Sequence, residues 1–186
     1  CTRVAVNKIY NDFKIRGLSC SKNSLHAFMD HLSDAYLLYP VSKYTRSERV
    51  RQVNPKKIYI ADNGLISAAS VHITEDRGAL LENLIFMHLR RTGDLIEYFH
   101  NDKGYEVDFV VRNPLNGQIK QLIQVCWTLA SEQTETREIR GLQAGMESLN
   151  CTNGTIVTWK NESQKSTATI SVVPAWQFLS SNRIGS

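Results

Sequence analysis

The sequence has no long apolar run and few cysteines, and both absences narrow the class of protein. No hydrophobic stretch approaches the roughly 20 residues of a membrane-spanning helix, so we expect no membrane partner. The cysteines are widely spaced and form no CxxC pair, which argues against a zinc knuckle and a disulfide framework. We therefore expect a reducing, cytoplasmic setting. The cysteines are Cys1, Cys20, Cys126 and Cys151.

Other motifs of catalytic and metal-binding proteins are also missing. The five histidines show neither HxH nor HxxxH spacing, which argues against a metal site built on them. The phosphate-binding loop GxxxxGK[ST] does not occur. The chain starts at Cys1 rather than Met and has no signal-peptide pattern, so we expect it to be a piece of a longer protein.

The charge of the chain is unevenly distributed. The 186 residues are 42% hydrophobic and 22% charged, values that are ordinary for a soluble globular protein. Residues 1–60 hold 11 Lys/Arg and 4 Asp/Glu, whereas residues 61–186 hold 11 Lys/Arg and 14 Asp/Glu. This asymmetry indicates two modules, the first facing a polyanion, although an ordinary solvated basic face would look the same.

Residues 1–62 have the pattern of a winged helix-turn-helix. In RVAVNKIYNDFKIRG apolar residues recur at helical spacing, and Gly17 is placed to end that helix. Ser21 can cap a second helix, whose apolar stripe is Leu25, Phe28, Met29 and Leu32. AYLLYPV and KKIYIAD then predict two strands, joined by a basic loop over residues 42–57 with six Lys/Arg and one Glu.

Such a module would contact DNA through the exposed side of its second helix and through its basic loop. Lys and Asn side chains can contact bases or phosphates, whereas Asp30 would repel phosphates. Small winged helices also act as protein–protein adaptors, so DNA and a protein partner both stay open. The candidate nucleic-acid contacts are Lys22, Asn23, His26, Lys43, Arg46, Arg49 and Arg51.

Residues 63–186 predict a second domain that mixes helices and strands. GALLENLIFMHLRRTG is a helix that is apolar almost all round, with Glu82 inside it. The strands LIEYFH, YEVDFVV and KQLIQVCW follow, then the helix SEQTETREIRGLQAGMESL and the strands GTIVTW and ATISVVPA. This order matches the restriction-endonuclease-like PD-(D/E)XK core, so the predicted fold class is α/β (α+β).

Four positions in that order match a nuclease site: Glu82, Asp108, Gln124 and Cys126. Regular pleating predicts Val107 and Phe109 on one face and Asp108 on the other, beside Gln124 and Cys126 of the next strand. In an active site the carboxylates hold a divalent metal that activates water. Here Gln124 carries no charge and Cys126 replaces a lysine, so we expect Mg²⁺ binding to be weak. Glu82 and Asp108 would be the metal ligands, and only if the site is active.

Structural roles for the same residues stay open. Asp108 could pair with Arg112, Glu82 could pair with Arg137, and Gln124 could simply cross-link two strands. Three aromatic residues are assigned to the core: Trp127, Trp159 and Trp176.

Five blocks, NPKKIYIADNGLI, GALLENLIFMHLRR, GYEVDFVV, LIQVCW and TETREIRGL, occur in an order that resembles a known family. It is the C-terminal half of predicted bacterial and archaeal AAA+ ATPases, a winged helix followed by a domain of unknown function with a restriction-endonuclease-like fold. The resemblance implies that an ATPase domain, with ATP and Mg²⁺, precedes Cys1, and that this chain holds no cofactor itself. Family members often carry Gln-x-Cys at the nuclease motif, as this chain does.

The leading hypothesis is therefore a recognition or regulatory region of an AAA+ ATPase, contacting nucleic acid or a partner protein, with a degenerate nuclease site and no catalysis of its own. An active metal-dependent DNA nuclease is one alternative. A purely protein-binding adaptor is the other.

Overall fold

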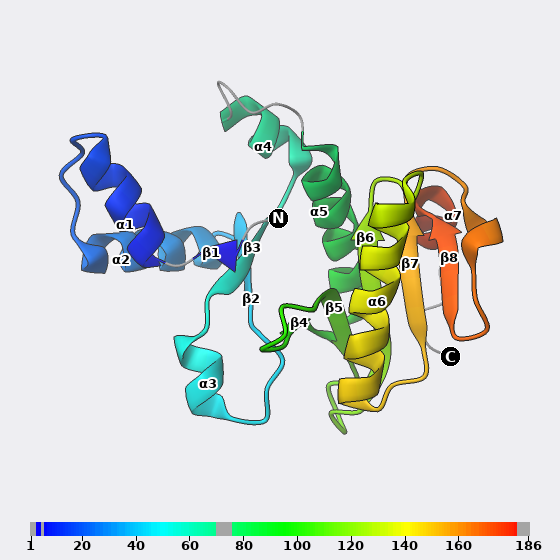
Figure 1. The fold of residues 1–186 in the computed structure, drawn as a ribbon. Helices are drawn as coiled ribbons and strands as arrows, with labels where there is room; N and C mark the ends of the chain where they lie inside the picture. Colours follow the sequence, from blue (N-terminus) through cyan, green and yellow to red (C-terminus); the bar gives the residue numbers. More distant parts are fainter. Residues whose placement is uncertain (1–2, 5, 70–75, 182–186) are drawn as a thin grey trace. The chain divides into compact units, whose positions relative to one another are not determined.

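The computed structural model describes residues 3–4, 6–69 and 76–181, which form two compact units, Cys1–Thr74 and Glu75–Ser186 (Figure 1). The sequence predicted a boundary after residue 62, and the division between the units follows Thr74. Cys1 and His72 lie outside the described residues. Each unit mixes helices and strands, which confirms the predicted class. Within the described ranges, no helix has the length and hydropathy of a membrane span.

The first unit consists of short helices and a small antiparallel sheet with the strand order β1-β3-β2. The turn between α1 and α2 forms as the sequence predicted. Gly17 has φ +71°, and the Leu18 amide donates to the Phe13 carbonyl at 2.9 Å. Ser21 caps α2 by accepting a 3.0 Å hydrogen bond from the Ser24 amide. The elements are β1 (Arg3–Val4), α1 (Val6–Ile15), α2 (Lys22–Asp34), β2 (Leu38–Val41), α3 (Glu48–Val53), β3 (Lys56–Ile60) and α4 (Asn63–Ala69).

The basic segment between β2 and β3 is not the continuous loop that the sequence predicted. It contains the helix α3, which begins after Ser47, whose hydroxyl accepts from the Val50 amide at 3.4 Å. The helix ends at Val53 because Asn54, which precedes Pro55, is extended, with φ −75° and ψ 145°. The Ser47 cap and the proline stop together make this six-residue helix.

The apolar stripe predicted for α2 is only partly buried. Leu25 is 5% exposed, but Phe28 is 57% exposed and Leu32 is 41% exposed. The predicted helix forms, but most of the surface of Phe28 and much of that of Leu32 stay exposed within it. The sheet of this unit consists of strands of two, four and five residues. It is too small to cover the 13-residue helix α2.

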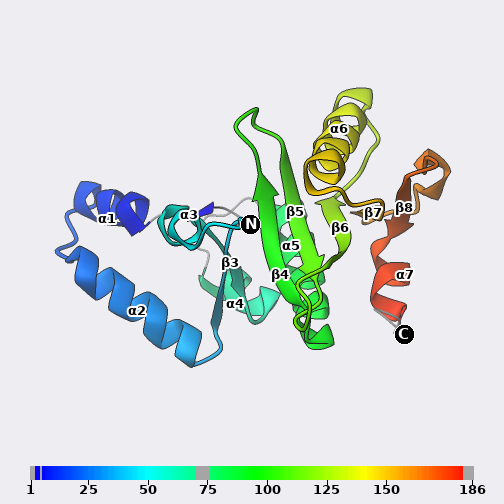
Figure 2. The same cartoon turned by 90° about the horizontal axis from the view of Figure 1, so that it is seen from below.

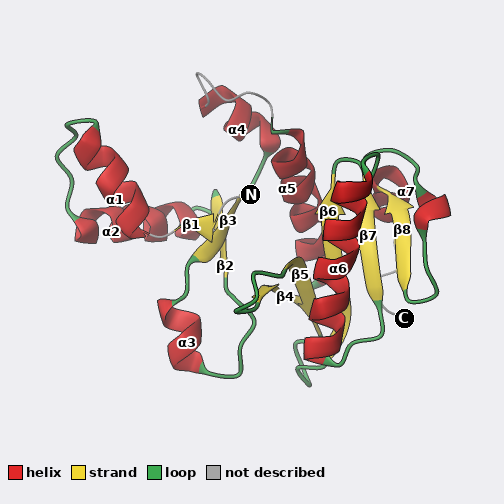
Figure 3. Ribbon diagram, in the orientation of Figure 1, coloured by secondary structure: helices red, strands yellow, loops and turns green. Residues whose placement is uncertain are grey.

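The second unit is a five-stranded mixed sheet with helices on both faces. The strand order is β4-β5-β6-β7-β8, antiparallel from β4 to β6 and parallel from β6 to β8. Helix α6 lies on one face, and α5 and α7 lie on the other (Figures 2 and 3). The elements are α5 (Arg77–Leu89), η1 (Arg90–Thr92), β4 (Leu95–His100), β5 (Glu106–Arg112), β6 (Ile119–Cys126), α6 (Glu132–Leu149), β7 (Gly154–Thr158), η2 (Ser163–Lys165), β8 (Ile170–Pro174) and α7 (Ala175–Ser180).

A bulge interrupts the edge of this sheet at Asp108. Glu97 of β4 pairs with Val110, but Phe99 pairs with Val107, so two β5 residues stand opposite one β4 residue. As a result Val107 lies under α6, while Phe109 stacks on Phe86 of α5 at 6.3 Å. The predicted regular alternation, with Val107 and Phe109 on one face, is therefore wrong at this point.

Helix α6 lies unusually close to β5 because glycines face the sheet. A Cβ added to Gly145 would lie 2.5 Å from Val107 Cγ2, and one added to Gly141 would lie 3.1 Å from the Glu106 carbonyl oxygen. Val107 is fully buried, so it has little room to move. This close approach brings the polar side chains of α6 within reach of β6.

We predict that Gly145→Ala lowers the free energy of unfolding. The helix-propensity gain of about 1 kcal/mol is smaller than the overpacking cost of roughly 1–3 kcal/mol. In a Val107→Ala background the collision is removed, so the same change should be neutral or stabilising there. Urea unfolding of the four proteins measures both effects. Equal destabilisation in both backgrounds would contradict the proposed collision.

Candidate functional site

Asp108 and Gln124 lie side by side, as the pairing of β5 with β6 predicted. The backbone amide of Asp108 donates to Gln124 Oε1 at 3.2 Å. The backbone amide of Val125 donates to Asp108 Oδ2 at 2.9 Å. Side chains thus replace ladder hydrogen bonds next to the bulge, and one carboxylate oxygen of Asp108 holds the neighbouring strand.

Glu138 of α6 joins this pair, although it was not among the site residues predicted from sequence. The Gln124 side-chain amide donates to Glu138 Oε2 at 2.8 Å. Arg137 donates to Glu138 Oε1 from Nε at 3.0 Å and from Nη2 at 2.5 Å, which raises the pKa of the guanidinium. Glu138 is 7% exposed, so its charge is paired rather than solvated. Its position four residues before the buried Leu142 on α6 is the signal that places it on the inner face of the helix.

We call the connected set Asp108, Gln124, Glu138 and Arg137 the Gln124 network. From the sequence, Arg137 and Arg112 were possible ion-pair partners of Glu82 and Asp108. Arg137 pairs with Glu138, its neighbour on α6, and Arg112 forms an ion pair with Glu97 at 2.7 Å. Gln124 does cross-link strands, and it also ties β6 to α6.

Cys126 lies two residues further along β6 and carries a neutral thiol. The side chain is 9% exposed, and its Sγ donates to the Thr128 carbonyl at 3.1 Å. Burial first, and the nearby Glu138 carboxylate second, raise the pKa of the Cys126 thiol to about 11. At neutral pH this group is neither a cation nor a thiolate, so it replaces none of the charge of a catalytic lysine.

Glu82 is the remaining residue of the predicted set, and it lies on α5, which covers the face of the sheet opposite α6. It is 8% exposed, while Asp108 is 6% exposed. Across the described ranges, no three or more His, Cys, Asp or Glu side chains are grouped to hold a metal ion. The structure therefore places Asp108, Gln124 and Cys126 together without forming a site of the usual charge for Mg²⁺.

Another buried carboxylate, that of Glu162, fixes the loop that leads from β6 into α6. Glu162 accepts from Thr128 Oγ1 at 3.0 Å and from the Leu129 amide at 2.8 Å. Lys165 donates to the Leu129 carbonyl at 2.6 Å and pairs with Glu135 of α6. These contacts hold the first turns of α6 in place, and with them Glu138.

The tryptophans are not all in the core. Trp127 and Trp159 stack at 4.9 Å with their rings 9° apart, and the Arg77 guanidinium lies 5.6 Å from the centre of the Trp127 ring. Trp159 is 49% exposed and Trp176 is 65% exposed. The core assignment is wrong for these two because Trp159 follows the last residue of β7 and Trp176 follows β8, where the sheet no longer covers them.

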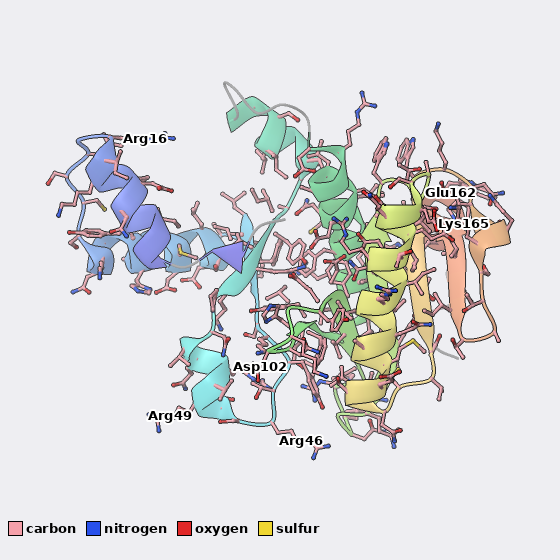
Figure 4. All side chains as sticks on the ribbon, viewed as in Figure 1. Arg16, Arg46, Arg49, Asp102, Glu162 and Lys165 are labelled. Atoms are coloured by element: carbon pink, nitrogen blue, oxygen red, sulfur yellow. The ribbon has the colours of Figure 1, made fainter. Side chains whose placement is uncertain are left out.

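The candidate nucleic-acid contacts of the first unit fall into two groups. Arg46 and Arg49 are exposed and extend away from the ribbon around α3 (Figure 4), and three residues of α2, Lys22, Asn23 and His26, are exposed as well. Lys43 is half-buried. Arg51 is held locally, since it donates to the Thr45 carbonyl at 3.2 Å and lies 3.6 Å from Glu48.

Comparison with known proteins assigns the second unit to a family. Residues 77–178 match "Domain of unknown function (DUF4143)", which is more than half of the chain. The chain belongs to the DUF4143 family. The DUF4143 domain begins at the first residue of α5 and ends within α7, so it contains the whole Gln124 network.

Two longer proteins are similar to the chain, and neither has a described function. "Uncharacterized protein MJ1544" of Methanocaldococcus jannaschii is 29% identical over 186 residues, covering 94% of this chain and 40% of that protein. An "Uncharacterized protein" of Haemophilus influenzae is 27% identical over 106 residues, covering 57% of this chain and 26% of that protein. The chain thus spans less than half the length of these relatives. No solved structure matches it.

We predict that Cys126 is the slowest of the described cysteines to react with iodoacetamide at pH 8. Its raised pKa of about 11 leaves little thiolate there, whereas Cys20 and Cys151 are half-buried in loops. Mass spectrometry of timed samples measures the three rates, and labelling in urea provides the control. Glu138→Gln should speed the reaction of Cys126, because it removes a charge that raises the pKa of the thiol. Equal rates for Cys126 and Cys20 in the folded protein would contradict the neutral buried thiol.

Proposed function

We propose that this chain is a recognition region of a longer ATPase, that it binds duplex DNA through its basic first unit, and that its nuclease-like second unit does not cleave DNA. The ATPase domain, with its ATP and Mg²⁺, would lie in a part of the longer protein outside this chain. The family resemblance and the length of the relatives support this context. The Gln124 network is the observation that carries the non-catalytic assignment.

The network supports this proposal because its polar groups are used for structure. Asp108 Oδ2 accepts a backbone amide, and both ends of the Gln124 amide are engaged. Glu138 is neutralised by Arg137 on one side and bonded to Gln124 on the other. A hydrolytic metal site needs carboxylates free to replace the hydration shell of the ion. Here Gln124 supplies a donor at the position where a metal would need another anion.

Duplex binding is supported by the charge of the first unit. Residues 1–60 carry a net charge of +7, and the exposed side chains of Arg46 and Arg49 are placed to approach a phosphate backbone. Lys22, at the start of α2, is exposed, and its ammonium group lies 5.4 Å from the centre of the Tyr10 ring.

A second candidate function is contact with another protein segment, and a specific observation favours it. Besides Phe28 and Leu32, the first unit exposes Ile15 by 83%, Leu18 by 53% and Tyr36 by 66%. Large apolar side chains exposed along α2 and on the segments that flank it offer surface that a partner protein could cover. This adaptor function would not depend on Arg46 or Arg49.

We predict weak, salt-sensitive binding of duplex DNA. Arg46→Ala with Arg49→Ala should lower the affinity and reduce the slope of log K against log salt by about 0.9 for each phosphate that the protein no longer neutralises. Arg90→Ala with Arg91→Ala, in the second unit, removes the same charge and serves as the control. Fluorescence anisotropy with a labelled duplex measures both quantities. Absence of binding at low salt, or equal loss in the control, would favour the protein adaptor.

We predict that the wild-type protein cleaves neither plasmid nor branched DNA with Mg²⁺ or Mn²⁺, and that Mn²⁺ leaves its melting temperature unchanged. Gln124→Glu replaces the donor that faces Glu138 with a second carboxylate, so it should lower the melting temperature at pH 8. Mn²⁺ should restore part of that loss, because the variant gains a ligand.

Gln121→Glu is the matched control for this experiment. Gln121 is bonded at 2.7 Å to Thr155 Oγ1, a hydroxyl that can turn and donate to the new carboxylate. The fall in melting temperature caused by Gln121→Glu should be smaller than that caused by Gln124→Glu, and Mn²⁺ should not change it. Metal-dependent cleavage by the purified wild-type protein, abolished by Asp108→Asn, would establish the nuclease alternative instead.

A further inference from the structure

A long groove runs along the exposed side of α6, beside the turn that joins β4 to β5. Two adjoining cavities of about 620 and 600 Å³ form it, and both are lined by Lys103, Tyr105 and Arg140. The first cavity reaches Glu132 at the start of α6, and the second reaches Ser148 near its end. Each cavity alone has the volume of a small-molecule site, but at a rise of 1.5 Å per residue the lining from Glu132 to Ser148 spans roughly 24 Å, a length that suits an extended chain.

The first cavity is rich in cations. Lys103, Arg137 and Arg140 line it, with Glu132 as the one carboxylate among its lining residues. Lys103 and Arg140 are exposed, and neither forms an ion pair in the part of the chain that the structure describes. Arg137 is bound to Glu138, so the Gln124 network sets its position. Two uncommitted cations and one fixed guanidinium make an anion site.

The second cavity has a different chemistry. Lys103 and Arg140 are balanced there by Asp102 and Glu147, and the remaining lining is largely polar and uncharged. Tyr105, shared by both cavities, is 37% exposed and presents an aromatic ring to the groove. Amide side chains in both cavities, Gln133 and Gln143, can donate to and accept from base edges.

We infer that this groove binds a single nucleic-acid strand, with a phosphate in the cation-rich cavity and a base stacked on Tyr105. A strand alternates charged phosphates with flat aromatic bases, and the groove alternates a cationic cavity with an aromatic, nearly neutral one. An acidic peptide would match the cations but leave the Tyr105 ring without a stacking partner. The site lies in the DUF4143 domain and is independent of the duplex contacts assigned to the first unit.

The test uses the full chain and a fluorescent oligothymidylate of about 12 nucleotides, a length within the site sizes of single-strand binders. Lys103→Ala with Arg140→Ala should weaken binding by at least about tenfold, the effect of removing one or more charged hydrogen bonds. The slope of log K against log salt should fall by about 0.7, the value for one phosphate of a single strand that the variant no longer neutralises. Tyr105→Leu should weaken binding, and Tyr105→Phe should leave it unchanged.

Two controls separate this site from other sources of binding. Arg91→Ala with Lys160→Ala removes two exposed cations of the same unit outside the groove, and should leave the affinity unchanged. Arg46→Ala with Arg49→Ala should weaken duplex binding and leave oligothymidylate binding unchanged, so failure of either site is seen separately. Circular dichroism checks that each variant is folded.

Three results would overturn the inference. The first is that the wild-type protein does not bind oligothymidylate at low salt. The second is that the groove variant and the control variant lose the same affinity. The third is that the protein binds a poly-glutamate peptide through Lys103 and Arg140 but does not bind the oligonucleotide.

Discussion

The structure of the DUF4143 domain depends on how it stabilises buried carboxylates. Asp108, Glu138 and Glu162 are each less than 9% exposed, and an unpaired charge at any of these positions would be costly. The Gln124 amide donates to the Glu138 carboxylate, while its oxygen accepts from the Asp108 backbone amide of β5. The Asp108 carboxylate accepts from the Val125 amide. A glutamate in place of Gln124 could accept from β5, but it would repel Glu138. The uncharged residue is therefore the one that the surrounding fold requires.

This requirement connects the geometry of the sheet to that of the helix. The bulge at Asp108 frees the β5 backbone from regular pairing, and the Asp108 carboxylate then holds the Val125 amide. Gly141 and Gly145 let α6 approach β5 closely enough for Glu138 to reach Gln124. Glu162 and Lys165 hold the start of the helix. A metal centre placed here would have to break several of these hydrogen bonds at once.

The same arrangement separates structure from recognition. Glu138 is buried, but the Arg137 side chain that pairs with it is 74% exposed, so the network ends at the surface. That surface is the groove along α6, with Lys103 and Arg140 beside it. The inner polar groups of this domain serve stability, while the exposed side chains of the groove are the ones that we infer to bind a ligand. Fold and activity are separable because the activity depends on a few residue types within the fold.

The sequence by itself determined the local features of this protein. The order of elements from α5 to β8, the Ser21 cap, the Gly17 turn and the proximity of Asp108 to Gln124 follow from periodicity, capping and strand pairing, which act over a few residues or between neighbouring strands. Only the tertiary structure decided that Glu138 joins Gln124, that Arg112 pairs with Glu97, and that Phe28 and Trp159 are exposed. These outcomes depend on how closely α6 approaches the sheet and how far each sheet extends. Distances between elements remote in sequence set both, and the pattern along the chain does not encode them.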